Sequence, residues 1–276
     1  MRGKELRQAL TAGQRVYGIA AEGYGQPRWP RFFSRLGLDF VFLDNEHTPL
    51  NRETVAWAAQ AYAANGVAPL LRIPEASPSQ AAMGLDLGAH GIIVPYVETV
   101  EQVKALAGAV KYRPLKGAAL RLAVNEGRLP NEATQRYLQD FNLEAILVIM
   151  IESPAGVENL PEMLAIGEVD AILVGPHDLS VSCGVPEEYD HPVFNRAVAE
   201  VIETCQDHDV SVGIHCPDLA GALHWAQAGC NFIVLSSDTL FIANGIHDQL
   251  DQIRQAVGDR LSDGNTATLG ASGHGV

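Results

Sequence analysis

Short runs of apolar, mostly β-branched residues alternate along this chain with longer stretches in which apolar residues recur at helical spacing. The short runs predict strands. They are apolar throughout and do not alternate with polar residues, which is typical of parallel strands covered on both faces. Eight such strands are predicted, at 15–22, 40–44, 68–73, 91–97, 146–153, 171–176, 210–215 and 232–237.

A segment of helical period follows each predicted strand, and several of these segments end in glycine, a common C-terminal stop. The predicted helices span 27–37, 51–66, 78–88, 99–112, 154–167, 191–209, 218–229 and 245–258, with a short extra helix near 131–141. Eight strand–helix units in 276 residues predict an α/β fold, a (β/α)8 TIM barrel in a single domain. A doubly wound open sheet is the alternative, but the chain lacks the G-x-G-x-x-G turn common in such sheets.

The barrel is expected to occupy residues 1–261, because the remaining segment, 262–276, is small and polar and predicts a disordered tail. The formal net charge of −14 disfavours binding to nucleic acid or to an anionic membrane surface. The longest apolar run, 145–151, is too short to span a bilayer. Four cysteines without C-x-x-C spacing are typical of a reduced, cytoplasmic protein. A small-molecule substrate is therefore expected.

Charged side chains follow many of the predicted strands. In a parallel barrel these strand ends surround one mouth, where active sites lie. A polar residue at one strand end means little, whereas several that converge indicate a site. The candidates are Asp44, Glu46, His47, Arg72, Glu152, Asp178, His215 and Asp238.

Glu152 and Asp178 follow adjacent predicted strands. Two carboxylates with open positions for water and substrate suit a hard cation such as Mg²⁺ or Mn²⁺. Each carboxylate could instead stabilise the start of the next helix. The spacing predicts a metal site and leaves this structural alternative open.

Arg72 could clamp a substrate anion with its planar fork or pair with a neighbouring carboxylate. His47 could be a structural histidine or a general base. Asp86 lies on a predicted helix, and its position alone indicates a surface or capping residue. His177 could contact a metal, a substrate or only its own loop. No lysine follows a predicted strand, so a Schiff-base mechanism has no candidate residue.

Four segments, FLDNEHTP, LLRIPE, MIESPAGVENL and VGPHDLSVSCG, occur in an order and spacing that resemble the HpcH/HpaI aldolase family. This family contains class II, metal-dependent aldolases related to the citrate lyase β-subunit, and the resemblance extends over residues 5–257. It implies a (β/α)8 barrel and a reversible aldol reaction between a metal-bound 2-oxoacid enolate, often from pyruvate, and an aldehyde. It also implies a homo-oligomer, usually a hexamer with active sites near subunit contacts.

The resemblance further implies roles for individual residues. Glu152 and Asp178 would bind the divalent metal ion, for which Mg²⁺, Mn²⁺ and Co²⁺ are candidates, and Asp44 would support the metal's outer coordination sphere. Arg72 would bind the 2-oxoacid and stabilise the enolate oxygen, while His47 would act as the acid and base. The remaining implied residues are Asp86, which would orient His47, and Gly175, Pro176 and His177, which would line the substrate pocket.

Three departures from the family pattern indicate a different acceptor pocket. The stretch after the fourth helix is shorter and has Lys116 where arginine is common, His177 replaces a small residue, and the last strand ends in LSSD. Besides the aldolase, two readings remain open. One is a citrate-synthase-like condensation of oxaloacetate with acetyl-CoA, as in the family's siderophore-associated branch. The other is a non-catalytic protein that binds a dicarboxylate.

Overall fold

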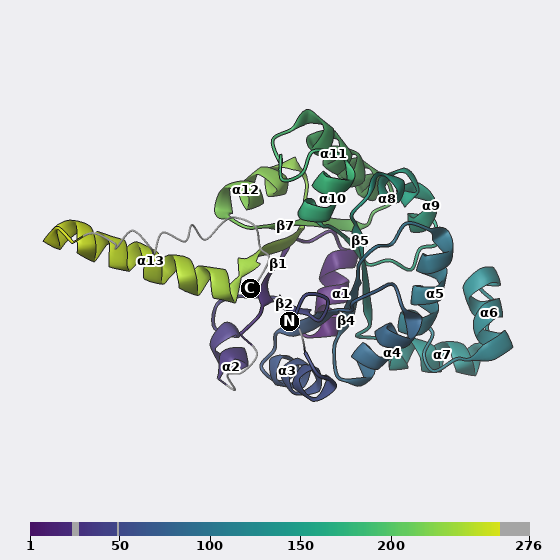
Figure 1. The fold of residues 1–276 in the computed structure, drawn as a ribbon. Helices are drawn as coiled ribbons and strands as arrows, with labels where there is room; N and C mark the ends of the chain where they lie inside the picture. The colour runs from purple at the N-terminus through teal and green to yellow at the C-terminus, as the bar shows by residue number, and fades with distance from the viewer. Residues whose placement is uncertain (24–27, 49, 260–276) are drawn as a thin grey trace.

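The computed structural model describes residues 1–23, 28–48 and 50–259, and the predicted tail at 262–276 lies outside them. Eight parallel strands close into a barrel in sequence order (Figure 1). The prediction of a (β/α)8 barrel is therefore confirmed. The strands are β1 Val16–Ala21, β2 Phe40–Asp44, β3 Ala68–Arg72, β4 Gly91–Val94, β5 Ile146–Ile151, β6 Ala171–Val174, β7 Ser211–Cys216 and β8 Phe232–Ser237.

Helices surround the barrel and connect the end of each strand to the start of the next. Many begin with a serine, threonine, asparagine or aspartate that caps the first turn, as at Asn51 and Thr99. The helices are α1 Gly3–Thr11, α2 Trp29–Phe33, α3 Arg52–Ala64, α4 Pro78–Asp86, α5 Val100–Lys111, α6 Gly117–Glu126, α7 Glu132–Phe141, α8 Pro154–Glu158, α9 Leu160–Leu164, α10 Pro176–Ser182, α11 Pro192–Asp207, α12 Leu219–Ala228 and α13 Asp238–Val257.

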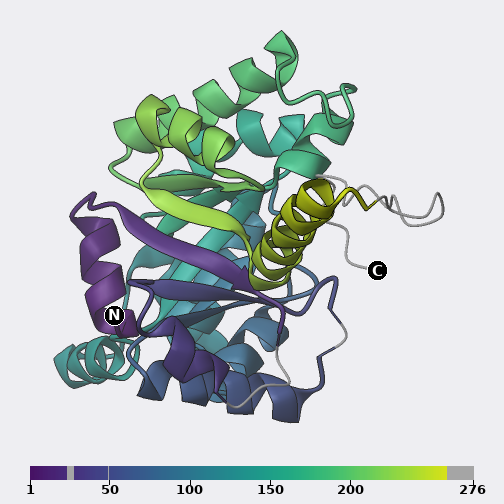
Figure 2. The ribbon, with the colours of Figure 1, turned by 90° about the vertical axis from the view of Figure 1, so that its left-hand side faces the viewer.

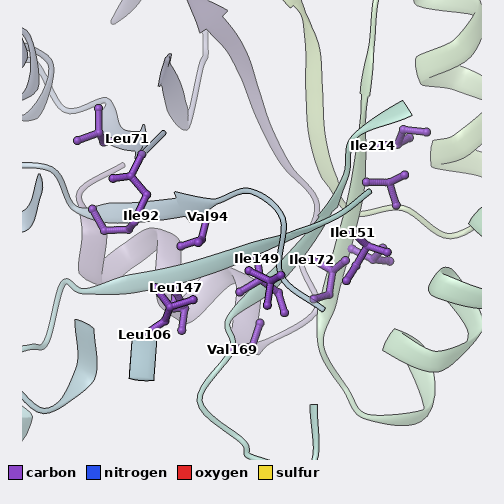
Figure 3. Close-up of a cluster of buried hydrophobic side chains, with 14 of the residues drawn as sticks. Leu71, Ile92, Val94, Leu106, Leu147, Ile149, Ile151, Val169, Ile172 and Ile214 are labelled. Atoms are coloured by element: carbon purple, nitrogen blue, oxygen red, sulfur yellow. The ribbon is translucent and has the colours of Figure 1, made fainter. Parts of the chain in front are cut away.

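The two faces of each strand bury different cores, which explains why the strands are apolar at every position. Outward-facing residues such as Leu147, Ile149 and Ile172 pack against the helices (Figure 3). Inward-facing residues fill the barrel, where the rings of Phe40 and Phe232 stack with centroids 4.6 Å apart. Side chains therefore occupy the barrel interior, and a ligand must bind at its mouth.

Helix α1 closes the end of the barrel opposite the mouth (Figure 2). Leu6 and Leu10 on α1 are fully buried and join the inward-facing core. The Gly3 N–H donates to His90 Nδ1 at 2.9 Å and fixes the start of the helix beside the start of β4. Thus α1 shields from water the inner core that the strands leave open at this end.

Several segments differ from the sequence prediction. Helices α1 and α10 lie where no helix was predicted, the helix predicted at 154–167 is divided into α8 and α9, and the strand predicted at 91–97 ends at Val94. The connection after α5 contains two helices, α6 and α7, because the apolar side chains of Leu120 and Val124 on α6 pack near Gly108 on α5. The last helix begins at Asp238, directly after β8, and is longer than predicted.

Helix α13 projects away from the barrel (Figure 1) and buries only Asp238 of its residues. Five apolar side chains form a stripe at helical spacing along it and are exposed: Ile242, Ile246, Leu250, Ile253 and Val257. We call these five residues the α13 stripe. Among the described helices, none has the length and apolarity needed to cross a membrane.

Candidate active site

The side chains that face the barrel interior are apolar along the strands and become polar where the strands end at the mouth. Pairing between β2 and β3 places Asp44 beside Arg72. Pairing aligns Ile151 with Val174 and Val174 with Ile214, so the next residues, Glu152, Gly175 and His215, lie at one level. The structure thus brings Asp44, Arg72, Glu152, Gly175 and His215 together at the mouth, where the sequence analysis expected the strand ends to meet.

Arg72 is held by two carboxylates. Its Nε and Nη2 donate to the two oxygens of Asp44 at 2.8 Å each, and Nη1 lies 3.1 Å from Glu46 Oε2. The guanidinium also lies over the Phe42 ring, 5.1 Å from its centroid. Arg72 is therefore fixed in one orientation, and it pairs with neighbouring carboxylates, one of the two roles that the sequence left open.

These contacts set the charges of the pair. Burial alone would raise the pKa of Asp44, but hydrogen bonds and charge from Arg72 bring that pKa below its ordinary value. Burial alone would lower the pKa of Arg72, but Asp44 and Glu46 raise it. Both groups are therefore ionised at neutral pH.

Glu152 lies at the end of β5 and is buried. Its Oε2 accepts a hydrogen bond from the backbone N–H of Tyr96 at 2.9 Å. A Cβ at Gly175 would lie 2.6 Å from the other oxygen, Oε1, so this carboxylate fits only because residue 175 has no side chain. Burial, with smaller contributions from the charges of Asp178 and Glu46, raises the pKa of Glu152 to about 7.

Tyr96 is a site residue that the sequence analysis did not identify. Its backbone has φ +55°, a conformation that non-glycine residues adopt rarely, and this conformation accompanies the hydrogen bond from its N–H to Glu152. Its phenol interacts with Glu46, which raises the pKa of Tyr96. The signal that could have indicated a turn here is Pro95, directly before Tyr96, because proline cannot donate a hydrogen bond to a neighbouring strand.

Asp178 lies in the first turn of α10, which begins at Gly175 and Pro176. Together with Glu152 and Tyr96 it lines a hollow of about 320 Å³. The side chain of His177 lies at the edge of the mouth, with Nδ1 3.5 Å from Glu187 Oε1. The two predicted metal ligands therefore share one polar hollow.

The residues present fit a hard divalent cation. Within the described residues, no three histidine, cysteine or carboxylate side chains converge tightly enough to enclose a metal by themselves. Glu152 and Asp178 instead offer two carboxylates with space beside them, and their mutual repulsion is part of what raises the pKa of Glu152. Mg²⁺ and similar ions commonly bind through one or two carboxylates and complete their shell with water and substrate.

His47 and Asp86 are not brought together within one chain. His47 is half-exposed at the mouth, with Nε2 3.8 Å from Glu46 Oε2. Asp86 ends α4, which returns from the mouth to the other end of the barrel, and its carboxylate lies 2.6 Å from Arg113 Nη1. The predicted pairing of Asp86 with His47 therefore has no contact in the isolated chain.

Asp238 has a structural role. Its buried carboxylate accepts hydrogen bonds from the backbone N–H groups of Glu22 and Gly23 and from the Trp29 indole. It thereby joins the start of α13 to the loop after β1.

A sequence profile of the HpcH/HpaI aldolase/citrate lyase family matches residues 26–244. The chain belongs to this family. A 2-keto-3-deoxy-L-rhamnonate aldolase from Klebsiella pneumoniae is 30% identical over 78% of this chain and 80% of its own length.

Solved structures agree with the family assignment. A HpcH/HpaI aldolase/citrate lyase family protein from Burkholderia cenocepacia superposes with a TM-score of 0.78 at 27% identity, over 91% of this chain and 99% of its own. The citrate synthase SbnG gives a TM-score of 0.78 at 25% identity, over 92% and 99% of the two chains. The expected enzyme class, a carbon–carbon lyase of the aldolase type, is confirmed by the family and its aldolase relatives.

Proposed function

We propose that this HpcH/HpaI family member is a class II aldolase that joins a pyruvate-like 2-oxoacid to an aldehyde, or cleaves the product. One observation carries the proposal. Glu152 and Asp178 share a hollow at the barrel mouth, close enough to Arg72 for its charge to act on Glu152. Two carboxylates for a cation and one fixed guanidinium for an anion are what a metal-dependent reaction of a 2-oxoacid requires.

Glu152 and Asp178 would hold the divalent cation, which is a general requirement of the family. We propose Mg²⁺ or Mn²⁺, with Co²⁺ as a further candidate, because both ligands are hard oxygen donors. When bound, the cation supplies Lewis-acid polarisation of the 2-oxoacid keto group. Asp44 would support the outer coordination sphere while it holds Arg72 in place.

Arg72 would bind the 2-oxoacid and stabilise the negative charge that develops on the enolate oxygen. Its orientation is set beforehand by Asp44 and Glu46, so little reorganisation is needed during the reaction. Gly175, Pro176 and His177 would line the pocket beside the substrate. His47 would carry the proton to and from the reacting atoms.

The active protein is proposed to be a cytoplasmic homo-oligomer, a hexamer by analogy with the family. Two features support an assembly. The α13 stripe leaves five apolar side chains without cover in the isolated chain. Asp86 lies at the end of the barrel opposite His47, so the proposed Asp86–His47 pair can form only between two chains.

The test is proton NMR of pyruvate in D₂O with the protein and Mg²⁺ or Mn²⁺, with EDTA as the control. An enzyme that forms the enolate will replace the methyl protons with deuterium, and the methyl signal will disappear only when metal is present. A stable methyl signal under every metal would contradict the proposal. It would favour the citrate-synthase-like condensation, for which oxaloacetate and acetyl-CoA are the pair to test, and absence of that activity as well would leave a non-catalytic dicarboxylate-binding protein.

A citrate-synthase-like condensation is the second candidate, and the structural similarity to the citrate synthase SbnG favours it. In that reaction oxaloacetate would be the electrophile and acetyl-CoA the donor. Release of free thiol from acetyl-CoA in the presence of oxaloacetate would identify this activity, and aldol product from pyruvate without thiol release would exclude it.

A further inference from the structure

Arg113 follows α5 and is largely buried, although its own chain does not satisfy it fully. Its side chain is only 15% exposed. Among the described residues, Nε is buried and has no hydrogen-bond partner. An unpaired buried donor lowers the stability of the fold, and nearly all buried polar groups in native proteins are paired. The position of this guanidinium therefore indicates a role other than stability.

Contacts from two helices fix the guanidinium of Arg113. Its Nη1 donates to Asp86 Oδ1 at 2.6 Å and to the carbonyl oxygen of Ala82 on α4 at 3.3 Å. The ring of Phe141 on α7 lies beneath it, with the centroid 5.6 Å from the guanidinium carbon. The Asn142 side chain donates to the backbone carbonyl of Arg113 at 2.8 Å. Arg113 is therefore held in one place between α4 and α7.

Asp86 is the exposed member of this ion pair, with a side chain that is 75% exposed. It is the last residue of α4, where the helix dipole disfavours a carboxylate. In the described part of the chain, its Oδ1 accepts the bond from Arg113 and its Oδ2 accepts no hydrogen bond. A fixed, largely buried cation thus holds an exposed carboxylate with one oxygen open to a partner outside the chain.

We propose that Arg113 is a positioning residue, which orients Asp86 so that Oδ2 can accept a hydrogen bond from His47 of a neighbouring copy of the chain. This role rests on the proposed aldolase function and its Asp86–His47 pair, and it adds the residue that fixes the carboxylate. Arg113 itself would not touch the substrate. A carboxylate that is hydrogen-bonded to an imidazole sets its orientation and tautomer, and proton transfer slows when that geometry loosens.

The test is a double-mutant cycle on pyruvate deuterium exchange with Mn²⁺, with kcat and KM measured separately. The proteins are the wild type, Arg113→Leu, Asp86→Asn and the variant that combines both changes. Arg113→Lys restores a cation at the same position. Arg136→Leu removes an arginine from an exposed position on α7 and is the matched control. Sedimentation equilibrium gives the molecular mass of each variant.

Arg113→Leu is expected to lower kcat about tenfold and to leave KM for pyruvate unchanged, because the base is misplaced while the pyruvate site is intact. Arg113→Lys is expected to recover part of this loss, and Arg136→Leu to match the wild type. In the Asp86→Asn background, Arg113→Leu is expected to cause no further loss, because it orients a group that is already absent.

A wild-type kcat in Arg113→Leu or in Asp86→Asn would overturn the proposal. So would an equal effect of Arg113→Leu in both backgrounds, because Arg113 would then act independently of Asp86. A loss of activity that accompanies a lower molecular mass would also overturn it, since Arg113 would then act on assembly. Failure of the wild-type protein to exchange pyruvate at all would instead contradict the proposed function.

Discussion

Burial and neighbouring charges set the protonation state of Glu152, a proposed metal ligand. Three carboxylates, Glu152, Asp178 and Glu46, act on one another at the mouth, and burial raises the pKa of Glu152 to about 7. One backbone N–H and the charge of Arg72 only partly oppose this effect. A cation bound at the proposed site would replace the proton and remove the repulsion, so metal and proton would compete for this carboxylate.

The competition predicts a pH dependence for the metal-free protein. The folded pKa of Glu152 is raised above its ordinary value of 4.5. Protonated Glu152 therefore contributes its full stability below about pH 4.5. This contribution is lost as the pH rises through about 7. Mn²⁺ affinity, measured by calorimetry, is expected to rise between about pH 6 and about pH 8 as the carboxylate ionises. An affinity that falls over this range would contradict the assignment of Glu152 as a ligand.

Replacement of Glu152 by glutamine separates metal binding from folding. Glu152→Gln is expected to lose metal binding and activity, because a neutral amide is a poor ligand for a hard cation. Without metal and above about pH 7, the variant is expected to melt at a higher temperature than the wild type, since it no longer buries a charge. Thermal unfolding with EDTA and with Mn²⁺ measures both effects, and full activity with bound metal would exclude this role.

At the scale of single elements, the sequence predicted the strands better than the turns. Asp44, Arg72 and Glu152 could be predicted as neighbours because parallel strands end at one face of a barrel. For Tyr96, the preceding Pro95 indicates that the strand ends, but neither the positive φ nor the hydrogen bond to Glu152 could be predicted from the sequence. The sequence placed Asp86 on its helix correctly. It did not predict the contact with Arg113, and within one chain Asp86 lies at the end of the barrel opposite the mouth.

Helix α13 carries a prediction of its own. The α13 stripe presents residues at spacings of four, four, three and four, which is one continuous helical face. Ile246→Glu places a charge in the middle of that face and is expected to reduce the molecular mass in solution towards that of a single chain. Sedimentation equilibrium measures the change. Gln255→Glu, at an exposed position on the opposite face, is the matched control and is expected to leave the assembly intact.

At the scale of the whole molecule, the two ends of the barrel have different functions. The mouth is polar and carries the candidate site, whereas α1 seals the other end with apolar side chains. The barrel interior therefore belongs to the same hydrophobic core as α1. The end closed by α1 thus contributes to stability, and the mouth carries the candidate active site, as is usual for this fold.

The contribution of α1 can be measured by removing one buried side chain. Leu6→Ala leaves a cavity at the closed end and is expected to lower the free energy of unfolding by about 2–5 kcal/mol. Urea denaturation measures this change. Gln8→Ala, at an exposed position on the same helix, is the control and is expected to change stability little. A similarly small effect of Leu6→Ala would mean that α1 is only loosely attached.

The closure of one end by α1 also determines how a ligand can reach the proposed site. Because α1 closes one end, the mouth is the open end of the barrel in the part of the chain that the structure describes. A 2-oxoacid at the proposed site beside Arg72 would therefore enter and leave through the mouth, as would the second substrate.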